Sequence, residues 1–262
     1  IETYGTPRRM LLVIRQLSES QPDITEETMG PSVNVAFDGD GNPTKAGMGF
    51  ARSRGVEVGD LFRVATDKGE YVAVKQTIEG RPTNELLTEE LPKWLAKLPF
   101  RKSMRWGSGE VAFVRPIHWL LALFGGKVIN FEYAGAISGN ISRGHRFHSP
   151  ATFAVTGVED YFKKIEDASV VIDPSARKEM IREQVAAEAA KVGGKVLEDE
   201  ELLDTVNYLL ELPTAVSGTF EEHYLELPRE LLILTMKTHQ KYFAVVDGAG
   251  NPWFHADVAI SE

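Results

Sequence analysis

Apolar and polar positions follow two periods along the chain, and the shorter of them predicts strands. A compact apolar run occupies 10–14, which is typical of a buried strand. Apolar and polar residues alternate over 61–66 and 71–77, and Gly69 lies at the bend between them, so we expect a β-hairpin there. The predicted strands are 10–14, 61–66, 71–77, 113–124, 128–133, 170–172, 242–246 and 253–258.

Helical spacing of apolar residues accounts for most of the remaining chain. Asp173 followed by Pro174 is a strong start for a long helix, and Thr156 with Glu159 has the spacing of a capping box. Pro92 falls inside another helical pattern, where we expect it to kink or split the helix. The predicted helices lie near 44–55, 83–95, 156–165, 173–193, 200–210 and 228–239.

This order of elements predicts an α+β fold with mixed or largely antiparallel sheets and packed helices. We expect two subdomains. The first, 1–150, is β-rich and carries a basic patch, and the second, 151–262, is helix-rich and ends in a hairpin. The chain begins at Ile1 rather than at a methionine and stops at Glu262 just after a predicted strand, so we expect it to be a piece of a longer protein.

Composition excludes several classes of protein. Hydrophobic residues make up 43% and charged residues 26% of the 262 residues, which is ordinary for a globular chain. There is no cysteine, which excludes disulfides and thiolate metal sites and makes a reducing cytoplasm the simplest compartment. The longest apolar run, 119–124, is too short to cross a bilayer, so no membrane association is expected.

Charge is distributed unevenly around a formal net charge of −9. Residues 101–148 hold seven Lys/Arg and two acidic residues, whereas residues 151–230 hold eight Lys/Arg and eighteen acidic residues. A basic block followed by an acidic one predicts two faces with different partners. The acidic stretch is also compatible with solvated helix surface alone.

No motif for catalysis is found. The sequence has no phosphate loop, no strand-bounded G-x-G-x-x-G, no G-x-S-x-G elbow and no cysteine nucleophile, so we expect no catalytic residue. His145 and His148 form the one close histidine pair. Arg143 and Arg146 interleave with it and disfavour a cation, and zinc sites need a third ligand, so no metal is expected.

Two basic segments are candidates for contact with a nucleic acid. The first combines three cations with an aromatic ring that can stack on a base: Arg101, Lys102, Arg105 and Trp106. The alternative is that Met104 and Trp106 anchor the segment in a core while the cations stay solvated.

The second basic segment follows a Gly- and Ser-rich loop. Arg143, His145 and Arg146 are predicted to donate hydrogen bonds to a phosphate. They are equally able to bond local carbonyls and hold the loop in place. A third candidate is Lys241, whereas a structural role at a helix C-terminus is favoured for Lys237.

Six short segments, read in order, closely resemble the β chain of bacterial glycyl-tRNA synthetase. They are Thr6-Pro-Arg-Arg-Met10, Asn42-Pro-Thr-Lys-Ala46 with Gly49-Phe-Ala-Arg52, Lys102-Ser-Met-Arg-Trp-Gly107, Phe113-Val-Arg-Pro-Ile117, Arg143-Gly-His-Arg-Phe147 and Met236-Lys-Thr-His-Gln-Lys-Tyr-Phe243. The resemblance extends from the first residues to about residue 246. At the tail the family reads Val-Ala-Asn, whereas this chain has Asp257-Val-Ala-Ile260.

The resemblance implies a cytoplasmic α₂β₂ enzyme that joins glycine to tRNA(Gly) with ATP. In that family the α chain carries the catalytic core, so ATP and Mg are expected there and no cofactor is expected in this chain. The β chain supplies tRNA binding. Two alternatives remain open: an editing-type hydrolase that uses His145 or His239, and an assembly domain whose acidic helices dock the α chain without touching RNA.

Overall fold

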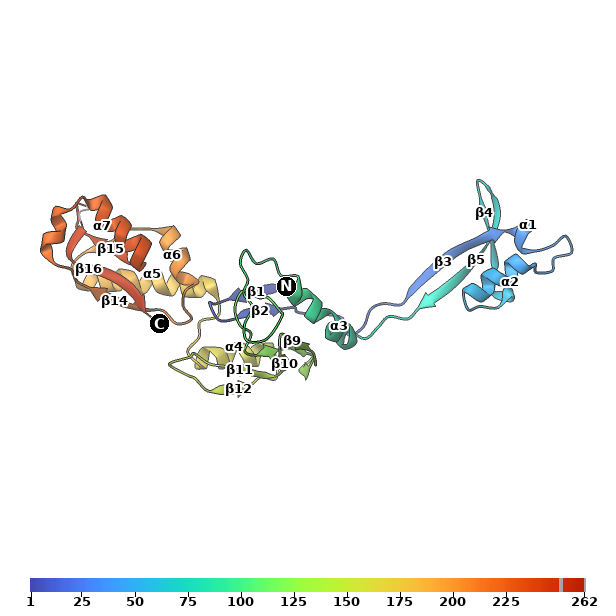
Figure 1. The fold of residues 1–262 in the computed structure, drawn as a ribbon, viewed down its shortest axis with the longest axis horizontal. Coiled ribbons are helices and arrows are strands. Elements are labelled where there is room, and N and C mark those ends of the chain that lie inside the picture. Colours follow the sequence, from blue (N-terminus) through green and yellow to red (C-terminus); the bar gives the residue numbers. More distant parts are fainter. Residues whose placement is uncertain (250–251, 262) are drawn as a thin grey trace. The chain divides into compact units, whose positions relative to one another are not determined.

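A computed structural model describes residues 1–249 and 252–261, with side chains up to residue 249. Helices alternate with short sheets that are antiparallel except where β10 pairs with β6, which confirms the predicted α+β class (Figure 1). The chain divides into two compact units: a larger one of 1–17 and 91–262, and a smaller one of 18–90. The predicted subdomain border near residue 150 lies inside the larger unit and stays a prediction.

The smaller unit is a three-stranded antiparallel sheet with two helices at one end. Its elements are β3 (Ile24–Ser32), α1 (Val33–Ala36), α2 (Lys45–Ser53), a 3-10 turn (Val58–Asp60), β4 (Phe62–Thr66) and β5 (Gly69–Ile78), with strand order β3-β5-β4. The predicted hairpin is therefore confirmed as β4 and β5, whereas the nine-residue strand β3 was not predicted.

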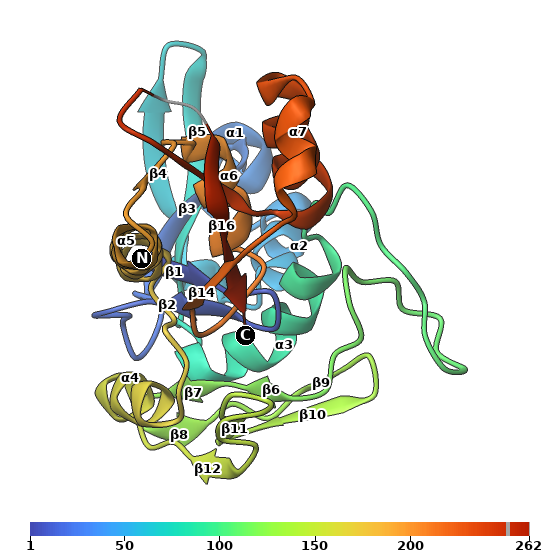
Figure 2. The ribbon, with the colours of Figure 1, turned by 90° about the vertical axis from the view of Figure 1, so that its left-hand side faces the viewer.

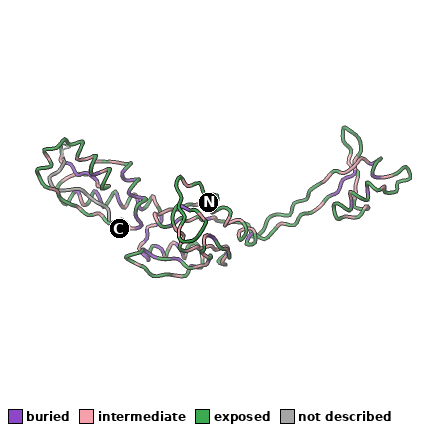
Figure 3. The backbone as a smooth tube through the Cα atoms, in the orientation of Figure 1, coloured by how far each residue is buried: buried purple, intermediate pink, exposed green. Residues whose placement is uncertain are grey.

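The core of this unit is small. Val33, Ala36 and Val72 are buried together, with Phe37 and Phe50 packed against them. Residues farther along β3 are mostly exposed, and buried positions are sparse there (Figure 3). The unit is therefore held mainly by the ladder of β3 and β5 and by this one cluster.

The helix α3 (Thr83–Ala96) runs across the border between the two units and keeps Pro92 within it. The larger unit then has a set of short strands and one helix. These are β1 (Glu2–Gly5), β2 (Met10–Val13), β6 (Leu120–Leu121), β7 (Leu123–Phe124), β8 (Lys127–Val128), β9 (Glu132–Tyr133), β10 (Ala136–Gly139), β11 (Ile141–Arg143), β12 (Thr152–Ala154) and α4 (Val158–Asp167). A cluster around Val155, Ile165 and Val170 forms their core.

Several sequence predictions fail in whole or in part here. The strand expected at 128–133 is reduced to the ends β8 and β9, and α4 begins at an N-cap Gly157 without the capping box expected of Thr156 and Glu159. The strand predicted at 10–14 is present as β2, but it is half exposed rather than buried, because β2 pairs only with β1 and buries one side.

The expected long strand 113–124 is broken: apart from one bridge, 113–119 is irregular. Residues 170–172 form no strand, because their buried backbone groups bond elsewhere. The Val171 amide donates to the Glu211 carbonyl and the Val171 carbonyl accepts from Arg177.

The last part of the larger unit packs helices on a four-stranded antiparallel sheet of order β13-β15-β16-β14. Its elements are α5 (Pro174–Lys191), β13 (Lys195–Val196), α6 (Glu200–Asn207), β14 (Thr214–Gly218), a 3-10 turn η2 (Glu222–Glu226), α7 (Arg229–Thr235), a π-helical turn (Met236–Gln240), β15 (Phe243–Val246) and β16 (Pro252–Ser261). The pairing of β15 with β16 confirms the predicted C-terminal hairpin, although its turn residues 250–251 lie outside the described residues.

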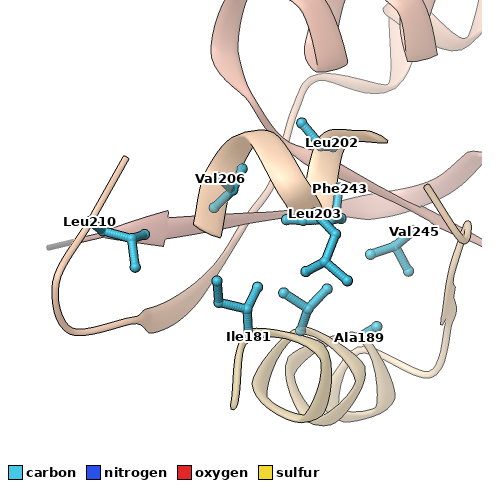
Figure 4. Packing of buried hydrophobic residues seen from close by; sticks show 9 residues of the cluster. Ile181, Ala189, Leu202, Leu203, Val206, Leu210, Phe243 and Val245 are labelled. Atoms are coloured by element: carbon cyan, nitrogen blue, oxygen red, sulfur yellow. The ribbon is translucent and has the colours of Figure 1, made fainter. Parts of the chain in front are cut away.

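Figure 4 shows how α5 is anchored. Ile181 and Ala189 on α5 point toward Leu203 on α6 and Val245 on β15, and all four side chains are buried. The carboxylate of Asp173 accepts hydrogen bonds from the second and third residues of α5, which confirms the predicted cap. Within the described part of the chain, no helix is both long and apolar enough to span a bilayer.

Candidate functional site

The first basic segment, 101–107, lies on an irregular loop between α3 and β6 (Figure 2). Met104 and Phe113 exchange backbone hydrogen bonds of 2.8 and 3.0 Å across its base. The Phe113 ring is buried and meets the rings of Phe100 and Tyr133 edge-on, with centroids 4.8 and 6.2 Å away. Packing of Phe113 thus fixes the base of the loop, and most residues between Met104 and Phe113 are exposed to solvent.

The side chains of this segment point outward. Arg101, Lys102 and Arg105 are exposed, and Trp106 is half buried. Met104 is 48% exposed, so it is not the core anchor that the sequence left open as an alternative. The anchor is Phe113, which the sequence had placed in a long strand.

Cations of the basic block 101–148 differ from those of the acidic stretch in their partners. None of its seven Lys/Arg side chains forms an ion pair with a carboxylate among the described side chains. Several cations of the acidic stretch are instead paired on the surface: Lys164, Lys178, Arg182 and Lys191. The positive charge of the basic block is therefore left for a partner or for solvent counterions.

The second basic segment divides into buried and exposed residues. Arg143 and Arg146 are exposed, and their guanidinium carbons lie 5.8 Å from the ring centre of Trp119 and 4.4 Å from that of Phe147. His145 is fully buried. Its Nδ1 accepts the backbone N–H groups of Phe147 and His148 at 3.3 and 3.2 Å.

His145 therefore organises this turn, and its burial argues against direct contact of its ring with a phosphate. The contact predicted for it stays a prediction, but the loop-holding alternative fits the geometry better. The same burial gives the editing alternative no support at this histidine, because a water-activating base needs access to the reacting water. The two arginines remain available at the surface.

The backbone of the second basic segment contacts a buried ionic cluster formed by Thr6, Arg9 and Glu211. The carboxylate of Glu211 accepts hydrogen bonds from the Thr6 hydroxyl at 2.6 Å and from Arg9 Nε and Nη2 at 2.7 and 3.0 Å. Arg9 also donates to the carbonyls of Arg143 and Gly144, at 2.6 and 3.0 Å. Two segments of the family resemblance that are far apart in the sequence, 6–10 and 143–147, thus meet at the Arg9 guanidinium, which Glu211 holds in place.

Glu211 was missed by sequence reasoning. It belongs to the acidic stretch that was interpreted as helix surface, yet none of it is exposed. Arg177 is buried beside this cluster, where its guanidinium donates to the carbonyls of Asn207, Val171 and Gly5. Burial lowers the pKa of Arg177. A signal was present in hindsight, because Glu211 interrupts an apolar run between Leu210 and Leu212.

Lys237 and Lys241 lie at the π-helical turn and its C-cap, and their contacts are local. Lys237 bonds the carboxylates of Asp199 and Glu201 at 2.8 and 2.9 Å, and the bond with Asp199 raises the pKa of Lys237. This supports the structural role expected for it. Lys241 has a left-handed φ of 60° and donates to the Thr238 carbonyl at 2.9 Å. Its predicted contact with RNA stays a prediction.

Metal ligands do not gather in the part of the chain whose side chains are described, since no group of three His, Asp or Glu residues is placed to hold an ion. The rings of His145 and His148 lie 4.7 Å apart, with the side chains of Arg143 and Arg146 interleaved in sequence. That arrangement does not resemble a zinc site, which needs further ligands.

Comparison with known proteins agrees with the resemblance. Residues 1–256 match the family described as glycyl-tRNA synthetase beta subunit. The chain is 50% identical over 250 residues to the glycine–tRNA ligase beta subunit of Syntrophotalea carbinolica, covering 95% of this chain and 36% of that protein. It is 48% identical over 256 residues to the same subunit of Syntrophus aciditrophicus, covering 97% of this chain and 37% of that protein. The chain therefore spans little more than a third of these relatives, and it belongs to the glycyl-tRNA synthetase beta subunit family.

Proposed function

We propose that this chain is a tRNA-holding part of a two-subunit glycyl-tRNA synthetase and carries no active site of its own. In this proposal the chain binds the sugar-phosphate backbone of tRNA(Gly) in the cytoplasm. The separate α chain, in a heterotetramer with the β chain, binds glycine, ATP and Mg and forms the ester. The proposed contact residues are the exposed Arg101, Lys102, Arg105, Arg143 and Arg146 and the half-buried Trp106.

One observation carries the proposal: the seven cations of the basic block have no carboxylate partner among the described side chains. Arg105 and Arg146 are exposed representatives of its two segments. Cations without an intramolecular partner are the ones that can release counterions from a phosphate backbone. Contacts of this kind position an RNA without reading its sequence.

The test is tRNA affinity as a function of salt, measured with the assembled two-subunit enzyme. We expect Arg105→Ala and Arg146→Ala each to weaken binding and to lower the slope of log affinity against log salt by about one unit, if each meets one phosphate. Aminoacylation should show a higher KM for tRNA with little change in kcat, because the reacting groups lie in the other chain.

Lys163→Ala is the matched control. Lys163 is exposed on α4, has no ion-pair partner among the described side chains and lies in the acidic stretch. Its loss changes net charge by the same amount but should leave the salt slope unaltered. Equal slopes for the wild type, Arg105→Ala and Arg146→Ala would refute the proposal and favour the assembly alternative.

A further inference from the structure

The turn 143–149 exposes cationic side chains on a backbone that is tied down at several points. The Gly144 N–H donates to the Ala151 carbonyl at 3.1 Å, and the His145 N–H donates to the Ala168 carbonyl at 2.9 Å. The ring of His145 closes the turn from within by accepting two of its N–H groups. Movement of the turn's cations is therefore limited mainly to their side chains.

Arg9 makes a further attachment to this turn from 134 positions away. Its Nη1 and Nη2 donate to the carbonyls of Arg143 and Gly144, at 2.6 and 3.0 Å. The opposite side of the link is Glu211, whose two carboxylate oxygens accept from Arg9 at 2.7 and 3.0 Å. The guanidinium carbons of Arg9 and Arg143 also lie 5.5 and 5.8 Å from the ring centre of the half-buried Trp119. Arg9 thus contacts both the backbone of the turn and the ring beside which Arg143 lies.

The energetics of this link suit a positioning role better than a stabilising one. The side chains of Arg9 and Glu211 are 4% and 0% exposed, and the loss of hydration of two buried charges offsets much of their attraction. An apolar pair of similar volume would join the same segments at least as stably. It would lack the planar set of N–H donors with which a guanidinium bonds a carboxylate and two carbonyls together. What the ion pair adds is therefore a fixed direction for the turn.

We propose that Arg9 and Glu211 are positioning residues for tRNA binding, which hold the turn 143–149 in the conformation in which Arg143 and Arg146 meet phosphates. The inference rests on the proposed function for that contact. Being buried, the ion pair acts through the turn and not by touching RNA. A turn that is already ordered loses less conformational entropy on binding, so affinity rises without any additional contact.

The test is a double-mutant cycle on the affinity of the assembled two-subunit enzyme for tRNA(Gly). Arg9→Lys keeps the buried positive charge beside Glu211 but cannot bond the carboxylate and both carbonyls at once. We expect it to weaken tRNA binding by about two- to tenfold, the effect of having to order one more side chain on binding. In the background of Arg143→Ala with Arg146→Ala, Arg9→Lys should have no further effect, because no cation is left to position.

Arg105→Ala is the matched control background, because Arg105 lies in the other basic segment. There the effect of Arg9→Lys on affinity should be fully retained. Aminoacylation should show the same split, with a higher KM for tRNA and little change in kcat. A general loss of structure would instead weaken binding alike in both backgrounds and would lower kcat.

A second variant separates positioning from stability. Arg9→Met with Glu211→Leu leaves no charge buried, so it should be more stable than Glu211→Ala, yet it has no donor for the carbonyls of Arg143 and Gly144. Its affinity for tRNA should stay below that of wild type in spite of the recovered stability. If Arg9→Lys does not fold, this variant takes its place in the cycle.

Wild-type affinity in either folded variant would overturn the inference. So would an effect of Arg9→Lys that persists undiminished without Arg143 and Arg146, since the ion pair would then be purely structural. Weaker binding by Arg105→Ala and Arg146→Ala alone tests the proposed function separately. If these two weaken binding but the cycle shows no coupling, the positioning role falls and the proposed function stands; if neither weakens binding, both fall.

Discussion

Removing the carboxylate of Glu211 should be among the most damaging single changes in the larger unit. The Glu211→Ala variant leaves the Arg9 guanidinium, whose side chain is 4% exposed, without its counter-ion. The Thr6 hydroxyl loses its acceptor as well. Because Arg9 also holds the carbonyls of Arg143 and Gly144, the damage should reach the turn that carries Arg146.

The magnitude follows from burial. Breaking a buried ion pair by removing one partner costs about 3–5 kcal/mol, because the remaining charge has no solvent to stabilise it. Replacing both partners by apolar residues of similar size is far milder. We therefore expect Arg9→Met with Glu211→Leu to recover part of the stability that Glu211→Ala loses, because no charge is left buried although the carbonyls of Arg143 and Gly144 lose their donor.

Urea unfolding is the assay, followed by tryptophan fluorescence. Trp119 is a local reporter, since the guanidinium of Arg9 lies 5.5 Å from its ring centre. Glu159→Ala is the control: this carboxylate is 78% exposed and pairs with Arg15 on the surface, so its loss should change the unfolding free energy little. A cost below about 1 kcal/mol for Glu211→Ala, or a double variant no better than the single one, would refute this reasoning.

Two further predictions concern a close backbone approach and a surface ion pair. On α2, Gly47→Ala should destabilise the smaller unit, because the added Cβ would lie 2.4 Å from the Ala36 carbonyl oxygen. The Cβ of Gly49→Ala meets nothing within 4 Å, so this change should stabilise the helix by up to about 1 kcal/mol. Thermal unfolding compares the two variants, and equal effects would contradict the packing argument. The Arg182 guanidinium lowers the pKa of Glu200 to about 2, so this carboxylate contributes stability above its ordinary pKa that is lost as pH falls toward about 2. The melting temperatures of wild type and Glu200→Gln should therefore converge on acidification, and a constant or growing gap would count against the ion pair.

Local features of the sequence were sufficient for several elements. The cap at Asp173, the hairpin of β4 and β5 and the C-terminal hairpin were predicted because each depends on residues close together in the chain. The family could also be recognised from short ordered motifs. Arg101, Lys102 and Arg105 are exposed, which agrees with the basic surface predicted from the charge distribution of the sequence.

Contacts between distant residues decided the rest. The same residue type, glutamate in an acidic stretch, is solvated at Glu200 and fully buried at Glu211, and only the arrival of Arg9 from 202 positions away distinguishes them. Likewise His145 is fully buried and bonds the backbone of Phe147 and His148, although the exposed Arg143 and Arg146 lie close to it in sequence. The sequence by itself determined the family, the fold class and the uneven distribution of charge. Only the tertiary structure decided which charges are neutralised inside and which are left for a partner, because burial and pairing depend on long-range contacts that no local pattern encodes.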